Sequence, residues 1–73
     1  MKLRTDQKLK LYGLYKQASL GDCNIPKPSA FKIEARAKFE AWDANRGMKK
    51  EDAMKEYIRL LTEADPKWES NPV

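Results

Sequence analysis

"LKLYGLYKQASLGDC", residues 9–23, combines a helical apolar pattern with an abrupt stop. Leu11, Leu14 and Ala18 recur at spacings of three and four residues, which places them along one stripe of an α-helix. Thr5 is a suitable N-cap for this helix, and Gly21 is a suitable stop after it. The sequence therefore predicts a helix over residues 6–19 with one apolar face.

Two further segments show the same helical period. A second helix is predicted over residues 33–46 and a third over residues 50–64. The second carries the stripe Ala35, Phe39, Trp42 and Arg46. The third carries the stripe Ala53, Met54, Tyr57, Ile58, Leu61 and Ala64.

Between the first two helices, residues 20–32 contain Pro26 and Pro28, which prevent a regular helix there. No window shows the alternating pattern of a half-buried strand. We therefore expect an all-α fold of three helices with one long loop, and frayed ends over residues 1–5 and 66–73.

Length, composition and charge limit the classes of function that the chain can have. The chain has 73 residues, so residues 1–73 should form a single domain with a small core. One cysteine, Cys23, excludes an internal disulfide, and the absence of histidine disfavours a zinc site and proton transfer near neutral pH. The net charge of +4 favours anionic partners. Since membrane-spanning and secretory segments are also absent, we expect a soluble cytoplasmic binding protein without a metal or cofactor.

A second face of the first helix carries phenols and an ammonium group: Tyr12, Tyr15, Lys16 and Ser19. Lys38 lies at the edge of the second helix's stripe, so Lys16 and Lys38 would open on one cleft if the stripes share a core. Such a cleft suits a phosphorylated nucleotide, whose phosphate takes charged hydrogen bonds while its base stacks on a ring. A plainer interpretation also fits, in which the tyrosines pack with wet hydroxyls and the lysines are solvated.

Three stretches, "LKLYGLYKQASLGDCNIPKP", "ARAKFEAWDANRG" and "KKEDAMKEYI", closely resemble the signature stretches of the acyl-CoA-binding protein family, in order and without gaps. The similarity runs from about Leu9 to Ala64 and is most specific around the two tyrosines. It implies a helical bundle of up-down-down-up topology. Proteins of this family bind medium- to long-chain fatty acyl-CoA esters as carriers or pool formers and perform no reaction on them.

The resemblance also implies the ligand contacts, which fall on Tyr12, Tyr15, Lys16, Lys38 and Tyr57. By this resemblance Lys16, Lys38 and the Tyr12 hydroxyl look like ligands of the ribose 3′-phosphate. Tyr15 looks like the ring that stacks on adenine, and Tyr57 would line the same pocket. An acyl tail adds about 0.8 kcal/mol for each buried methylene, so long chains should bind more tightly.

One departure from the family concerns the N-terminus. Family domains carry an additional amphipathic helix before the position of Asp6, where this chain has only "MKLRT". We therefore expect an N-terminally short domain that exposes part of the Leu11 and Leu14 stripe, or of the stripe on the helix that carries Tyr57. Folding and acyl binding should be weaker than in full-length relatives, and the exposed face would permit self-association.

Two other functions are considered beside the carrier. The chain could be an acyl-CoA-sensing or interaction module of a larger lipid-metabolism enzyme or scaffold, which would allow a peroxisomal or mitochondrial location. Acyl-CoA-using enzymes are expected partners in either case. A basic nucleic-acid binder rests only on the charge balance, and we expect no nucleic-acid partner.

Overall fold

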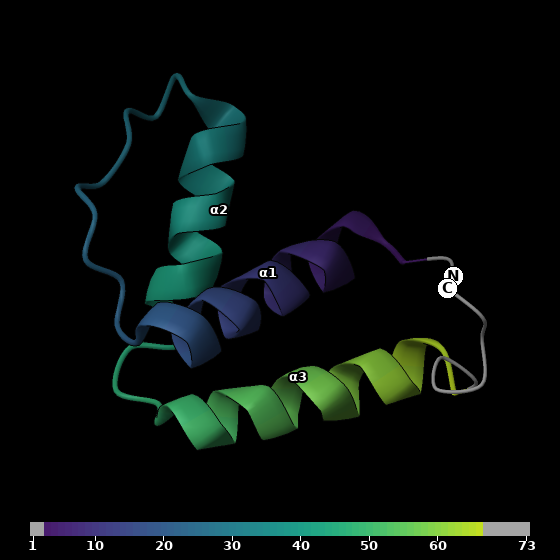
Figure 1. Ribbon diagram of the computed structural model, residues 1–73. Coiled ribbons are helices and arrows are strands. Elements are labelled where there is room, and N and C mark those ends of the chain that lie inside the picture. The colour runs from purple at the N-terminus through teal and green to yellow at the C-terminus, as the bar shows by residue number, and fades with distance from the viewer. Residues whose placement is uncertain (1–2, 67–73) are drawn as a thin grey trace.

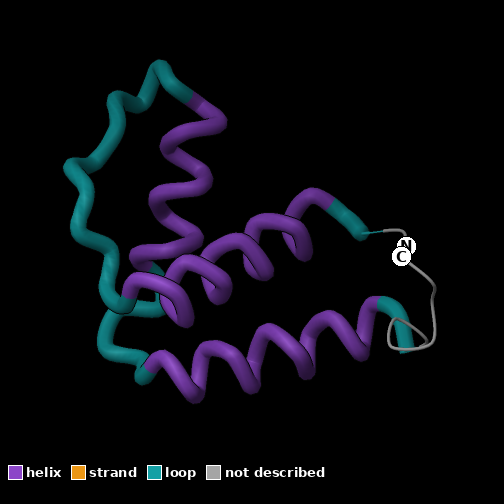
Figure 2. The backbone as a smooth tube through the Cα atoms, viewed as in Figure 1, coloured by secondary structure: helices purple, strands orange, loops and turns teal. Residues whose placement is uncertain are grey.

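The computed structural model describes residues 3–66 and contains three helices in that part of the chain (Figure 1). They are α1 (Thr5–Leu20), α2 (Ile33–Asp43) and α3 (Lys50–Ala64). Residues 3–66 contain no strand, and a long loop joins α1 to α2 (Figure 2). The all-α prediction is confirmed. The expected fraying of residues 1–2 and 67–73 lies outside the described residues.

Helix α1 is the centre of the arrangement. It packs extensively against both α2 and α3. Helix α3 runs beside α1 in the opposite direction, whereas α2 rises from the C-terminal half of α1 at a steep angle (Figure 1). The other two helices are therefore held in place mainly through α1.

Gly13 allows α1 and α2 to approach each other. It is buried, and a Cβ atom at this position would collide with the backbone carbonyl of Ala41 and lie 3.1 Å from Nδ2 of Asn45. Only glycine leaves this space for a neighbouring backbone. The glycine between the two tyrosines thus fixes where the helices cross.

The ends of α1 differ partly from the prediction. Arg4, not Thr5, is the N-cap, and Thr5 is already helical. The Gln7 side chain accepts a hydrogen bond from the Arg4 backbone N–H at 2.9 Å, as the N3 residue of a capping box does. The C-terminal stop is confirmed at Gly21, which has φ of 84° and donates its N–H to the Gln17 carbonyl at 3.0 Å.

The second helix is shorter than predicted: it ends at Asp43 and not at Arg46. Residues 44–47 form turns, in which Asn45 N donates to Trp42 O at 3.0 Å and Arg46 N donates to Asp43 O at 3.1 Å. The Arg46 guanidinium leaves the expected stripe and donates to the Cys23 carbonyl across the loop at 3.0 Å. The backbone therefore leaves the α-helix in tighter turns that end at Gly47, which has φ of 89°.

The buried apolar side chains of residues 3–66 are Leu11, Leu14, Cys23, Trp42 and Ala53. Leu11 and Leu14 are each only 7 % exposed, so the apolar stripe of α1 is not the one that is left open to solvent. The exposed stripe is that of α3, where Met54 and Ile58 are 46 % and 42 % exposed. Ala35, predicted in the α2 stripe, is exposed, because α2 meets α1 near its other end, around Ala41 and Trp42.

A polar clamp, formed by Gln17 and Asp22, ties the end of α1 to the turn before α3. The fully buried Gln17 amide donates to Asp22 Oδ1 at 2.9 Å and to the Met48 carbonyl at 2.8 Å. Asp22 Oδ1 also accepts the Gly47 backbone N–H at 2.8 Å. That backbone hydrogen bond, helped by Gln17, lowers the pKa of Asp22 below its ordinary value of 3.8.

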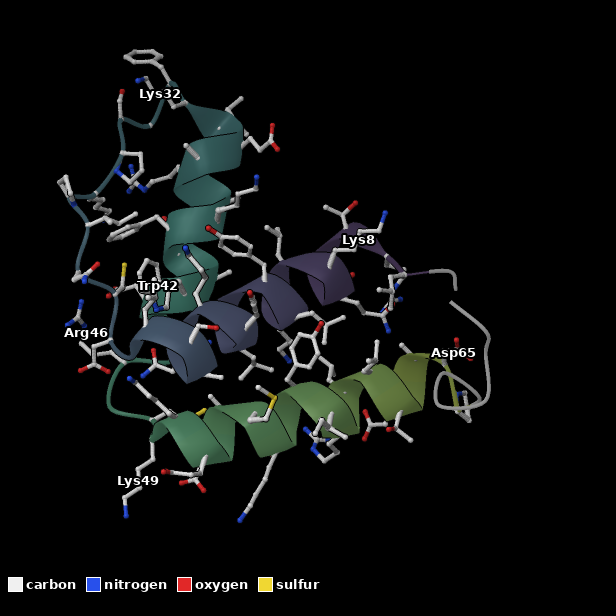
Figure 3. The ribbon with its side chains drawn as sticks, in the orientation of Figure 1. Lys8, Lys32, Trp42, Arg46, Lys49 and Asp65 are labelled. Carbon is white, nitrogen blue, oxygen red and sulfur yellow. The ribbon has the colours of Figure 1, made fainter. Side chains whose placement is uncertain are left out.

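Trp42 and Arg46 attach the long loop to α2 and the turn that follows it. The Trp42 indole N–H donates to the Gly21 carbonyl at 2.8 Å, and Arg46 binds the Cys23 carbonyl two residues later. Figure 3 shows Trp42 at the junction of α1 and α2, with Arg46 beside the start of the loop. The base of the loop is thus held by side-chain contacts, although it has no regular structure. None of the three helices is long and apolar enough to cross a bilayer.

Candidate functional site

The ring of Tyr12 is the meeting point of two cations from different helices. Lys16 Nζ, on α1, lies 6.0 Å from the centroid of this ring, and Lys38 Nζ, on α2, lies 5.7 Å from it. Lys16 Nζ also lies 5.1 Å from the Trp42 ring. Such distances allow attraction between an ammonium group and an aromatic face. The crossing of α1 and α2 therefore brings together three of the five residues predicted for the site.

The two ammonium groups have different neighbours. Lys38 Nζ lies 3.3 Å from Oε1 of Glu34, one helical turn earlier on α2, in an exposed ion pair. Lys16 forms no ion pair with an acid among residues 3–66. One cation of the pair is thus available for an external anion, and the other must exchange a weak, exposed partner for it.

The remaining two predicted residues, Tyr15 on α1 and Tyr57 on α3, form a ring pair. Their centroids lie 6.5 Å apart with the planes inclined at 53°. Tyr15 is 52 % exposed, so part of its ring is open to solvent. A recess of about 280 Å³ is bordered by this pair and by Tyr12, Leu3, Lys8 and Leu11. Tyr12 therefore links the cation pair to the ring pair.

An apolar groove begins beside Lys38 and runs between α1 and α2. Its volume is about 650 Å³, and it is lined by Thr5, Lys8, Leu9, Tyr12, Ile33, Glu34, Ala37 and Lys38. Its surface is mostly apolar, and Lys8 and Lys38 are the cations in its lining. A ligand with a charged head and an aliphatic tail matches this combination of surfaces.

Several lining residues of the groove were not predicted, among them Leu9, Ile33, Glu34 and Ala37. Leu9 lies one turn before Tyr12, and Glu34 and Ala37 lie close to Lys38 on α2. Helical spacing from the predicted residues was the available signal for them. Ile33 had no such signal, because the groove exists only once α2 has crossed α1.

The arrangement provides cations, ring faces and an apolar surface, but little for acid–base chemistry. Within residues 3–66, no cluster of three or more histidine, cysteine or carboxylate residues could hold a metal ion. Cys23, the free thiol, is buried at the base of the loop beyond the groove lining. The site is therefore suited to holding an amphipathic anion.

Comparison with known proteins gives consistent matches along most of the chain. The family described as acyl CoA binding protein matches residues 1–61. The acyl-CoA-binding protein of Dictyostelium discoideum is 49 % identical over 63 residues, which cover 86 % of this chain and 75 % of that protein. The mouse diazepam-binding inhibitor-like 5 is 52 % identical over 61 residues, covering 84 % of this chain and 70 % of that protein.

A solved structure agrees with the sequence matches. The solution structure of the acyl CoA binding protein from Babesia bovis superimposes with a TM-score of 0.82 at 45 % sequence identity. The match covers 94 % of this chain and 78 % of that one. Sequence and fold thus point to the same family.

Proposed function

The chain belongs to the acyl-CoA-binding protein family, and from that premise we propose that it binds long-chain fatty acyl-CoA esters without transforming them. One observation carries the proposal for the site. Lys16 and Lys38, from two different helices, approach the same Tyr12 ring, and Tyr12 and Lys38 also line an apolar groove. This arrangement has a place for a phosphate, for a base and for an acyl tail.

In the proposed complex, the ribose 3′-phosphate lies between Lys16 and Lys38 and accepts hydrogen bonds from both ammonium groups. The Tyr12 hydroxyl is the third donor. A hydrogen bond to a charged group contributes about 1.5–3 kcal/mol, so two lysines would dominate recognition of the head group. The ring of Tyr12 and that of Trp42 hold the cations near this position before the ligand arrives.

The adenine ring stacks on Tyr15 in this proposal. The Tyr15 ring is half exposed and is inclined to Tyr57, so an open ring face is available next to a second aromatic wall. Stacking of a base on an aromatic side chain contributes about 1–3 kcal/mol. Tyr57 borders the same recess from α3, and the ligand would therefore contact all three helices.

The acyl tail occupies the groove between α1 and α2. Leu9, Ile33 and Ala37 provide its apolar lining, and Lys38 stands beside it. Each buried methylene should contribute about 0.8 kcal/mol, so affinity should rise with chain length until the groove is filled.

Isothermal titration calorimetry tests this assignment. Palmitoyl-CoA should bind saturably, and its analogue without the 3′-phosphate and free palmitate should bind far more weakly. Lys16→Ala and Lys38→Ala should each weaken palmitoyl-CoA binding roughly 10- to 100-fold, which corresponds to one lost charged hydrogen bond. Lys55→Ala, an exposed lysine on α3 with the same change of charge, is the matched control and should leave the affinity nearly unchanged.

Two results would contradict the assignment. Equal affinity for palmitate and palmitoyl-CoA would show that the coenzyme A head group does not contribute to binding. Equal losses in Lys55→Ala and the two site variants would show that only the overall positive charge matters.

A further inference from the structure

The end of the loop and the first residue of α2 form a tip, residues 27–33, whose largest apolar side chains are exposed to solvent. Phe31 is 95 % exposed and Ile33 is 79 % exposed, which are the two highest values among the large exposed apolar residues. Lys32, between them, lies at the extreme end of the molecule, remote from α3 (Figure 3). Single exposed apolar side chains are ordinary, but two at one projecting end form a small surface patch.

The tip has a defined backbone conformation. Ser29 Oγ accepts the Phe31 backbone N–H at 3.2 Å, and the Ser29 carbonyl accepts the Lys32 N–H at 3.0 Å. The Arg36 guanidinium on α2 donates to the Pro28 carbonyl at 3.3 Å and joins the tip to the helix. Phe31 is therefore presented outward by a hydrogen-bonded turn.

Positive charge surrounds the apolar side chains. Lys27 and Lys32 are exposed, and residues 24–33 contain no acidic residue. The next acid along the chain, Glu34, pairs with Lys38 at 3.3 Å. Exposed lysines beside an exposed phenylalanine complement a surface that presents anionic head groups over an apolar interior.

We propose that the tip docks on an anionic membrane surface, with Phe31 and Ile33 inserted at the boundary and Lys27 and Lys32 against the lipid head groups. Ile33 also lines the apolar groove, so docking brings the groove close to the bilayer. Docking itself does not require acyl-CoA. Its use in exchanging an acyl ligand with the membrane rests on the proposed function.

Vesicle flotation of the full chain without acyl-CoA tests the proposal. The chain should bind phosphatidylcholine vesicles that contain phosphatidylserine and should bind pure phosphatidylcholine vesicles far less. Phe31→Ser should lower the partition coefficient at least about tenfold, as loss of one buried phenyl group implies. Phe31→Trp should restore it, because tryptophan also suits the bilayer interface. Lys27→Gln with Lys32→Gln should lower binding to the anionic vesicles alone.

Met54→Ser is the matched control, since Met54 is a half-exposed apolar residue on α3, and it should retain binding. Phe31 does not line the groove, so Phe31→Ser should keep the calorimetric affinity for palmitoyl-CoA. This readout separates failure of docking from failure of the proposed function.

Undiminished vesicle binding by Phe31→Ser, or equal binding to neutral and anionic vesicles, would overturn the proposal. Self-association of the wild type that Phe31→Ser abolishes would assign the tip to a second copy and would also overturn it.

Discussion

Lys38 has a competing partner inside the candidate site. The Glu34 carboxylate lies 3.3 Å from its ammonium group and also lines the groove. The pair is exposed, with 46 % of the Lys38 side chain and 84 % of the Glu34 side chain accessible. A phosphate that approaches Lys38 must therefore displace this carboxylate or accept its repulsion.

Glu34→Gln should tighten acyl-CoA binding by a few-fold, because exposed ion pairs of this kind are worth at most about 1 kcal/mol. Calorimetric titrations with palmitoyl-CoA at low and moderate salt would measure the gain, which should shrink as salt screens the charges. Glu63→Gln on α3 makes the same change of charge at a carboxylate paired with Arg59, outside the site. An equal gain in affinity in this control would show that only the net charge of the chain matters.

At the scale of the elements, Gly13→Ala has two opposite effects on the stability of the fold. Alanine is the better helix former by about 1 kcal/mol, so propensity alone predicts a more stable α1. A Cβ atom at residue 13 would collide with the Ala41 carbonyl, a backbone group that cannot rotate away. We expect the collision to dominate and to lower the free energy of unfolding by roughly 1–3 kcal/mol.

Urea denaturation followed by circular dichroism would measure this change. Ser19→Ala, at an exposed position of the same helix, should stabilise slightly and reports the propensity effect alone. If Gly13→Ala were as stable as Ser19→Ala, α1 and α2 would not cross as closely as described.

The polar clamp makes the joints between elements sensitive to acid. The pKa of Asp22 is lowered in the folded chain, first by the Gly47 N–H and then by Gln17. Ionised Asp22 therefore stabilises the fold fully above its unfolded pKa, and this contribution is lost as the pH falls through the lower folded pKa. Asp22→Asn should unfold at lower urea than the wild type at pH 7, and the difference should begin to shrink as the pH falls below about 4, vanishing only below the lowered pKa of the folded chain. Urea midpoints measured over this range would test it, and parallel midpoints at every pH would contradict the assignment.

The sequence predicted the helices well because their signal is local. The spacing of Leu11 and Leu14, and the position of Gly21, depend on neighbours along the chain, and the structure agrees with both. Helix α2 ends three residues earlier than predicted, and Arg46 instead reaches the Cys23 carbonyl, a contact across 23 positions that no local pattern encodes. Element interiors were therefore predictable, whereas this boundary was set by packing.

Candidate site residues divide in the same way. Helical positions suggested a cleft with Tyr12, Tyr15, Lys16 and Lys38, and the resemblance to family motifs added Tyr57. The structure gathers the five residues around one recess and one ring. Their ligand roles stay predictions. Glu34 lies one helical turn before Lys38, so helical spacing could have found it. Ile33 was missed because its relation to the site arises from the crossing angle of α2, which the sequence pattern does not specify.

At the scale of the whole molecule, cohesion depends on α1. Helices α2 and α3 each pack mainly on α1, and the buried apolar set within residues 3–66 is small. A chain of this size buries too little surface for a large stability margin. The proposed ligand would contact Lys16 on α1, Lys38 on α2 and Tyr57 on α3, and would add a link between α2 and α3, which have little contact with each other.

Acyl-CoA should therefore stabilise the fold strongly. A ligand that binds only the folded chain, present at 100 times its Kd, adds about 2.7 kcal/mol, which for a domain of this size raises the Tm by roughly 10 to 20 °C. Thermal melts with and without palmitoyl-CoA would measure the shift. The combined variant Lys16→Ala and Lys38→Ala should melt near the ligand-free wild type whether or not ligand is present. An equal shift in that variant would mean that the ligand is held elsewhere, because the proposed link between α1 and α2 requires both ammonium groups.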